Sequence, residues 1–193
     1  RYTWHTPIVL SVMITVGFIG TFGYNFSVVL PLLGGFVLHT DAMGFGALSS
    51  ALGIGSSLGA LTAAFFQKVS LKRLLIAAAG FSILLAAVAM STQLLLSEIL
   101  LVVLGFFGVI FSTNAATLIQ TTVEDHLRGR VTSLYFLLFA GSTPIGSFLI
   151  GTISSRLNVR DALLICATLC LFGVAVSSGY AYLVHKRSAP SAL

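Results

Sequence analysis

The sequence predicts an all-α membrane protein with six transmembrane helices, and three observations lead to that prediction. Only 8% of the residues are charged and 57% are hydrophobic, with a mean hydropathy of +1.05, whereas charged residues make up about 25% of a typical soluble domain. Apolar runs long enough to cross about 30 Å of hydrocarbon recur along the whole chain. The charged segment from Glu124 to Arg130 separates two of these runs and is predicted to be a short loop in water.

The six predicted spans are uninterrupted apolar stretches close to or above the roughly 20 residues that a crossing helix needs. They cover about Thr6 to Leu38, Met43 to Phe66, Leu74 to Thr92, Ile99 to Val123, Val131 to Ser155 and Ala162 to Val184. The segments between them are short, so residues 1–193 are interpreted as one transmembrane domain without a soluble part. No motif indicates a cofactor or a metal, and none is expected.

Lysine and arginine residues divide unevenly between the two ends of this bundle. Arg156 and Arg160 lie at one end, and the other end carries Arg1, Lys68, Lys72, Arg73, Arg128, Arg130, Lys186 and Arg187. The positive-inside rule therefore places both termini in the cytoplasm. Because these basic residues stand at the ends of apolar runs, the net charge of +5 indicates contact with a lipid bilayer and not with nucleic acid.

Two connecting segments share a pattern of basic, aliphatic, small polar, aliphatic and basic residues. They are Lys68-Val-Ser-Leu-Lys72 and Arg156-Leu-Asn-Val-Arg160, which lie 88 positions apart (156 − 68). An offset of three helices reverses direction across the membrane, so the pattern predicts a 3+3 inverted repeat, the plan of many secondary transporters. Repeat one would cover about residues 6–92 and repeat two about residues 94–185. Chance similarity between apolar helices is the alternative.

Proline and glycine residues mark two further features. Pro31, followed by Gly34-Gly35, predicts a kink or a broken last turn near the end of the first span. Such a bend could serve gating, although membrane helices also tolerate Pro and Gly without a special role. In the second span, Gly55 and Gly59 form a small-xxx-small pair that predicts close packing against a neighbouring helix.

Several motifs together resemble the major facilitator superfamily, and more narrowly its branch of bacterial siderophore and macrolide exporters. They are Ile119-Gln120 with Leu127-Arg-Gly-Arg-Val131, Asn25-Phe26 with Leu30-Pro31, Thr143-Pro-Ile-Gly146, and Arg160 to Ile165. The resemblance implies the carboxyl-terminal half of a twelve-helix carrier in the bacterial cytoplasmic membrane. The missing amino-terminal half would then be its partner, and the absence of Met at Arg1 fits a fragment.

The resemblance also implies secondary-active export of a bulky, largely apolar small molecule, such as a drug or a siderophore. A stand-alone six-helix protein that acts as a homodimer or a subunit scaffold is the alternative. An intramembrane hydrolase would need a Ser and a His buried together. It is not expected, because every His lies at a span end: His5, His39, His126 and His185.

The family's cytoplasmic signature, Gly-x-x-x-Asp-Arg-x-Gly-Arg-Arg, falls on Ala63 to Lys72 and matches only in part. The residues implied in gating at the cytoplasmic end are Lys68, Lys72, Arg73, Arg128, Gly129 and Arg130. For Lys68, Lys72 and Arg73 the alternative role is to anchor the helices and set the topology.

Polar residues within the spans are costly in lipid, so they are expected to face a cavity or the bundle interior. The candidates for solute binding are Tyr24, Asn25, Thr113, Asn114, Tyr135, Ser142 and Thr143. Asn25 and Asn114 lead, because an amide must satisfy both donors and acceptors. Interhelical hydrogen bonds that only hold the bundle together are the alternative. An apolar aromatic surface suited to bulky solutes is expected from Phe18, Phe22, Phe26, Phe106, Phe107, Phe111, Tyr135, Phe136 and Phe139.

Overall fold

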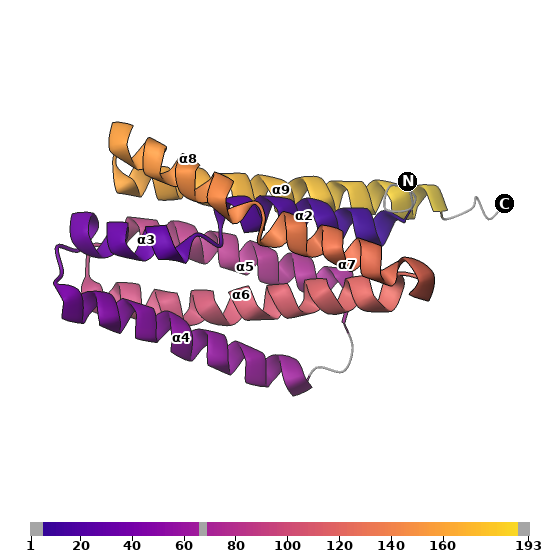
Figure 1. Ribbon diagram of the computed structural model, residues 1–193, viewed down its shortest axis with the longest axis horizontal. Helices are drawn as coiled ribbons and strands as arrows, with labels where there is room; N and C mark the ends of the chain where they lie inside the picture. The colour runs from indigo at the N-terminus through magenta and orange to yellow at the C-terminus, as the bar shows by residue number, and fades with distance from the viewer. Residues whose placement is uncertain (1–5, 66–68, 189–193) are drawn as a thin grey trace.

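The computed structural model describes residues 6–65 and 69–188, and every regular element in these ranges is a helix (Figure 1). The elements are α2 (Pro7–Phe22), α3 (Phe26–Leu32), the π-helix η1 (Leu33–Val37), α4 (Ala42–Phe65), α5 (Leu71–Met90), α6 (Leu94–Thr122), α7 (Asp125–Phe139), α8 (Thr143–Arg156) and α9 (Val159–Ser188). They make 6 spans long and apolar enough to cross a membrane, the first comprising α2, α3 and η1 and the fifth α7 and α8. The predicted all-α, six-helix class is confirmed.

The charged segment from Glu124 to Arg130 corrects one boundary, because most of it is helix and not loop. Helix α7 begins at Asp125. An acidic residue in the first turn is favoured by the positive end of the helix dipole. In addition, Arg128 forms an ion pair with Asp125 one turn away. Because both partners are exposed, this pair contributes little to stability, but it suits a helix start in water.

The most extensive helix contacts follow a pattern that is kept when the first three spans are exchanged for the last three. Helix α4 packs against α6, as α7 and α8 pack against α2. Likewise α5 packs against α6 as α9 packs against α2, and α5 and α9 contact each other. An inverted 3+3 repeat requires these equivalences, while the residue bounds of the two repeats stay a prediction.

Helices α4 and α6 are in backbone contact, as the small-residue pair in α4 predicted. A Cβ atom added to Gly55 would lie 1.8 Å from the carbonyl oxygen of Val102, and one added to Gly59 would lie 2.7 Å from that of Phe106. No side chain larger than hydrogen fits at Gly55 unless the helices separate. The close packing predicted from these glycines is therefore confirmed.

The first span is irregular in two places. Beyond Pro31 it continues as the π-helix η1, in which the Leu38 N–H bonds the Leu33 carbonyl at 2.9 Å. The expected irregular last turn thus takes the form of a wider helical turn. The second irregularity, at 23–25, was not predicted: the N–H groups of Gly23 and Tyr24 both donate to the Ile19 carbonyl, and α2 ends there.

The fifth span is also broken, at residues 140–142 between α7 and α8. Pro144 explains this break, because it has no N–H to donate to the Ala140 carbonyl and its ring would clash with that group in a continuous helix. The Ala140 carbonyl instead accepts from the Thr143 N–H at 3.3 Å. Two of the six spans are therefore discontinuous near their middles.

Candidate functional site

The two breaks are packed directly against each other. Gly146, in the first turn of α8, approaches the end of α2 so closely that a Cβ atom would lie 1.7 Å from the Thr21 carbonyl oxygen and 2.6 Å from Asn25 Nδ2. Only glycine allows this approach of one backbone to another. The first and fifth spans thus meet at the points where both lose regular helical hydrogen bonding.

Asn25 links the two breaks through both ends of its amide. Its Nδ2 donates to the Thr21 carbonyl at 2.6 Å, which replaces the bond that its own backbone N–H would form in a continuous helix. Its Oδ1 accepts from the Ser147 hydroxyl on α8 at 3.0 Å. The side chain is 0% exposed, so Asn25 faces the bundle interior, and its role in solute binding stays a prediction. The alternative interhelical role fits its contacts.

The contributions of Asn25 and Ser147 to the free energy of unfolding should therefore be coupled. Asn25→Leu removes both hydrogen bonds and should lower the unfolding free energy by about 1–2 kcal/mol. A cycle with Ser147→Ala should give a coupling energy of about 0.6–1.7 kcal/mol, the range seen between membrane helices. The measurement is thermal unfolding of the purified protein, with Ser178→Ala as an exposed serine control on α9. Additive effects of the two changes would remove Ser147 from this role.

An aromatic cluster surrounds the break in the first span. The ring of Tyr24 stacks on Phe81 of α5 with centroids 5.3 Å apart, and it meets Phe139 of α7 edge-on at 4.7 Å. Phe26 also contacts Tyr24, and Tyr135 stacks on Phe139 at 5.8 Å. These five residues form the aromatic cluster. Aromatic pairs in such geometries add about 0.5–1.5 kcal/mol beyond their buried area.

The two tyrosines of the aromatic cluster are also fixed at their hydroxyl ends. Tyr24 donates to the Gly108 carbonyl, and Tyr135 donates to the Ser112 carbonyl at 3.4 Å. Both acceptors lie on α6, one turn apart. Ring stacking and hydrogen bonding together hold the tyrosines between the first, fourth and fifth spans, so the cluster is a rigid part of the interior.

A cavity of ≈110 Å³ lies beside the aromatic cluster. Tyr24, Phe26 and Phe81 line one side, and the other side is formed by α4 and α6 through Leu52, Ser56, Gly105, Gly108 and Val109. No charged side chain is among these lining residues, and the Ser56 hydroxyl already donates to the Leu52 carbonyl at 2.8 Å. The walls therefore suit an apolar group of a ligand better than an ion.

The remaining predicted polar residues occupy different environments. Thr113 is exposed on α6, whereas Asn114 is buried and donates to the Ile110 carbonyl of its own helix at 2.8 Å. The Ser142 hydroxyl donates to the Leu138 carbonyl and that of Thr143 to the Phe139 carbonyl, which satisfies the end of α7 at the break. Among the residues described here, no polar contact joins Asn114 to Asn25. Of these four residues, only Thr113 is exposed to solvent.

The residues predicted for cytoplasmic gating lie at one end of the bundle. Lys72 and Arg73 are exposed in the first turn of α5, whose start is capped by Ser70 accepting from the Arg73 N–H at 3.3 Å. Arg128, Gly129 and Arg130 are exposed on the first turns of α7. Lys68 lies outside the described residues. A gating role for this set stays a prediction.

Phe81, Gly108 and Ser147 were not predicted as site residues. Phe81 lies within a uniformly apolar helix, where no periodic signal distinguishes one buried ring from another. Ser147 carried a weak signal, because a small polar residue three positions after Pro144 is placed one turn into the new helix and can face the break. Within residues 6–65 and 69–188, no group of His, Cys, Asp and Glu side chains could hold a metal ion.

Six apolar spans, two of which are broken at mid-length, are the architecture of a multi-pass membrane transporter. The sequence profile of the transmembrane secretion effector family, a branch of the major facilitator superfamily, matches residues 1–190, and the chain belongs to this family. The predicted membership of the major facilitator superfamily is confirmed.

A curated relative gives a second comparison. The chain is 27% identical over 168 residues to the multidrug efflux pump Tap of Mycolicibacterium fortuitum. The alignment covers 85% of this chain and 40% of the pump, so the chain spans less than half the length of that relative. No solved structure matches the chain.

Proposed function

We propose that the chain is the carboxyl-terminal half of a secondary-active exporter that moves a bulky, largely apolar small molecule such as a drug or a siderophore. The observation that carries the proposal is the pair of broken spans that meet beside an uncharged aromatic cavity. Transporters commonly place their solute sites at discontinuous helices near the middle of the membrane. Membership of the secretion effector family and similarity to a multidrug efflux pump support the direction of transport.

The solute would contact this half through the aromatic cluster and through Thr113 on α6. The cavity of ≈110 Å³ is too small for a whole bulky molecule, so it would take one apolar group of the solute. Thr113 is exposed on α6 and could donate a hydrogen bond to a polar atom elsewhere on the solute. The remainder of the site would be supplied by the amino-terminal half.

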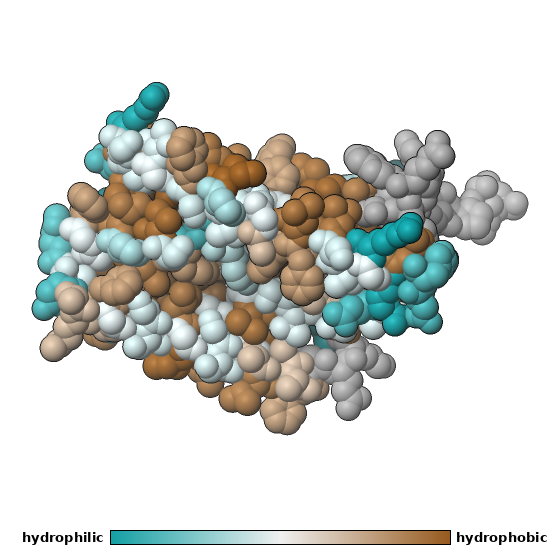
Figure 2. Space-filling view, in the orientation of Figure 1, coloured by the Kyte–Doolittle hydropathy of each residue, from teal (hydrophilic) through white to brown (hydrophobic). Residues whose placement is uncertain are grey.

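Helix α4 offers a surface on which that half could dock. Beside its contact with α6, it exposes a stripe of small residues spaced three or four apart: Gly46, Ser50, Gly53, Ser57, Ala60 and Ala64. A Cβ atom added to Gly46 or Gly53 would meet nothing within 4 Å, and pale residues stand among brown ones along α4 in Figure 2. Small residues let a second membrane helix approach closely. We therefore place the partner half on this stripe.

The experiment is uphill efflux of a fluorescent apolar compound from proteoliposomes. A chain extended by its upstream coding sequence should carry out transport, and residues 1–193 alone should not. Transport by residues 1–193 alone would favour a stand-alone homodimer.

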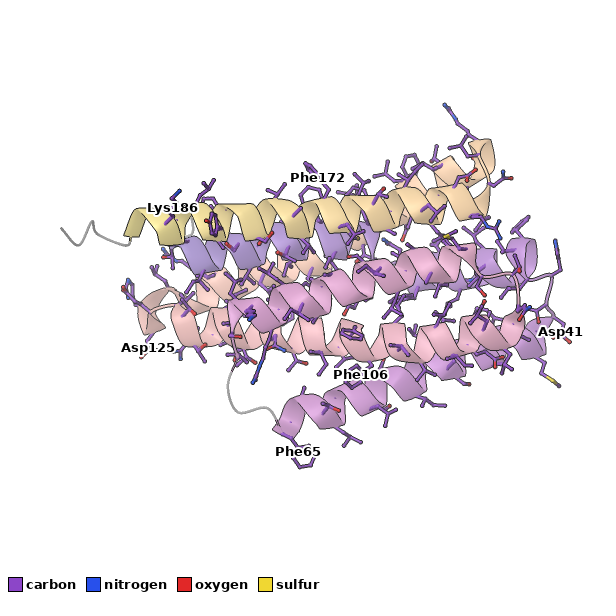
Figure 3. The ribbon with its side chains drawn as sticks, turned by 180° about the vertical axis from the view of Figure 1, so that it is seen from behind. Asp41, Phe65, Phe106, Asp125, Phe172 and Lys186 are labelled. Carbon is purple, nitrogen blue, oxygen red and sulfur yellow. The ribbon has the colours of Figure 1, made fainter. Side chains whose placement is uncertain are left out.

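Figure 3 shows Asp125 and Lys186 at one end of the bundle and Asp41 at the other. We propose that the Asp125 end is cytoplasmic and that the membrane is the bacterial cytoplasmic membrane, because most Lys and Arg residues lie at that end. A cysteine at Asp125 should be labelled by an impermeant maleimide only in inside-out vesicles. A cysteine at Asn158, exposed at the other end, is the control and should be labelled in intact cells. The reverse pattern would invert the topology.

Energy coupling is proposed to depend on a titratable group in the amino-terminal half. The acids of this chain, Asp41, Glu98, Glu124, Asp125 and Asp161, all lie within the first two turns of a helix or in a loop beside one, and a proton carrier usually needs one within the membrane. Glu98 is half-buried in the second turn of α6 and is the residue to test. Glu98→Gln should leave uphill transport and its pH dependence unchanged. Loss of uphill transport with downhill exchange retained would make Glu98 the coupling residue.

A further inference from the structure

A second pocket lies at the end of the bundle opposite Asp125, away from the aromatic cluster. Its volume is ≈570 Å³, and it lies between η1, the end of α8 and the start of α9. Its walls include Phe36, Val37, Ser154, Leu157, Arg160 and Asp161. None of these residues takes part in the site described above, so the proposed solute site does not account for this pocket.

Arg160 is held in a fixed position in the wall of this pocket. Its Nε donates to the Ala89 carbonyl at 3.2 Å, and its Nη2 donates to the Met90 carbonyl at 3.5 Å. These carbonyls belong to the last turn of α5, where a helix has no internal donors left. A guanidinium group has five N–H donors, so Arg160 retains donors for a ligand. Among the residues that the structure describes, Arg160 forms no ion pair.

The opposite charge lines the same pocket. Asp161 is exposed, and its Oδ2 has a long contact of 3.5 Å with Asn158 Nδ2. In the described part of the chain, its carboxylate is in no ion pair, including with the neighbouring Arg160. The pocket thus presents a cation and an anion that do not neutralise each other. A ligand that carries both charges could bind both.

Apolar side chains border these charges. Phe36 is 69% exposed and Leu157 is 54% exposed, although both are large and hydrophobic. The pocket lies where the spans end, which in a bilayer is the level of the lipid headgroups. A ligand at this level meets charged groups and hydrocarbon together. The amino-terminal end of α9 also favours a negative group here.

From these contacts we infer that the pocket binds a phosphoethanolamine group, supplied by a membrane phospholipid. The phosphate would bind Arg160, the ammonium would donate to Asp161, and the acyl chains would lie along Phe36 and Leu157. A phosphatidylcholine headgroup has the same charges but no N–H donors for Asp161. Phosphatidylglycerol has the phosphate without the ammonium. The site should therefore rank phosphatidylethanolamine above both lipids. The inference requires only that the chain lies in a membrane and does not depend on the proposed transport.

The test is a lipid titration of the full-length protein in detergent, read by native mass spectrometry. Phosphatidylethanolamine should bind several-fold more tightly than phosphatidylcholine with the same acyl chains. Arg160→Gln should weaken its binding about tenfold, as expected for loss of a charge-assisted contact. Asp161→Asn should remove the preference for phosphatidylethanolamine over phosphatidylcholine. The matched control is Arg156→Gln, which removes the same charge from an exposed position in the same connecting segment.

The binding of phosphatidylethanolamine to this pocket can be supported or overturned by the following results. Equal binding of phosphatidylethanolamine to the Arg160→Gln and Arg156→Gln variants would overturn the inference. Equal binding of the three lipids to the unaltered protein would also overturn it. Arg160→Lys keeps the charge and should retain most of the preference, which separates ligand binding from the capping of α5. Competition by soluble glycerophosphoethanolamine at the same concentration as the lipid would support the headgroup chemistry but overturn the membrane source.

Discussion

Gly146→Ala should abolish most transport and lower the melting temperature, whereas Gly151→Ala should change neither appreciably. At Gly146 the new methyl group would lie 1.7 Å from the Thr21 carbonyl oxygen, a backbone atom that cannot rotate away. Overpacking of this kind costs about 1–3 kcal/mol, and the backbone contact puts this change at the upper end. The breaks in the first and fifth spans would have to separate. The measurements are efflux in proteoliposomes and thermal unfolding in detergent.

Gly151 provides the matched control because it lies on the same helix, α8. A Cβ atom there meets nothing within 4 Å, and alanine also favours a helix interior over glycine by up to about 1 kcal/mol in soluble proteins. If both variants transport and unfold alike, the close contact at Gly146 does not contribute to function. A loss of stability without a loss of transport would restrict its role to folding.

Tyr24→Ala should also abolish transport, while Tyr24→Phe should retain most of it. The alanine change removes the ring contacts with Phe81 and Phe139 and enlarges the cavity of ≈110 Å³ beside them. Truncation of a large buried aromatic side chain costs about 3–5 kcal/mol in soluble cores. Phenylalanine keeps the ring and loses only the hydrogen bond to the Gly108 carbonyl, which is worth about 0.6 kcal/mol on average between membrane helices.

The difference in transport between Tyr24→Ala and Tyr24→Phe tests the role of the ring. Efflux rate against solute concentration should show a raised half-saturation value for Tyr24→Phe and no measurable transport for Tyr24→Ala, with folded protein confirmed by size-exclusion chromatography. Equal, near-normal transport by both variants would show that the aromatic cluster neither binds solute nor supports the transporting conformation.

The six spans could be predicted because composition alone determines them. A helix is the only way to satisfy the backbone of an isolated apolar segment in hydrocarbon, so long runs without charge predict the spans to within a few residues. The largest boundary error was at the start of α7. There the local charges of Asp125 and Arg128 extend the helix into a segment that polarity indicated to be loop.

The two breaks differ in how far the sequence could predict them. The fifth span contains Pro144, which breaks the helix through a local steric effect, so this break was in principle predictable. The break at Gly23 has no comparable local cause. It is stabilised by Gly146 and Ser147, which are distant in the sequence and are placed there only by the folded arrangement of the spans.

Asn25 shows the same limit for the candidate site. The cost of an unpaired amide in lipid correctly indicated that this side chain needs hydrogen-bond partners. It could not indicate that these partners would be the Thr21 carbonyl and Ser147, which occupy both ends of the buried amide. Tyr24 and Tyr135 were named as polar residues, but their stacking with Phe81 and Phe139 depends on how three spans pack together.

The most direct test of the central claim, a solute site at the broken spans, is protection of a cysteine at Ser56. This residue lines the cavity opposite Tyr24, and the two native cysteines, Cys166 and Cys170, are buried and would be replaced by alanine. In the full-length protein, the transported compound should slow alkylation of a cysteine at Ser56 several-fold and leave a cysteine at Ser178, exposed on α9, unaffected. An equal alkylation rate of this cysteine with and without saturating compound would contradict a solute site at the broken spans.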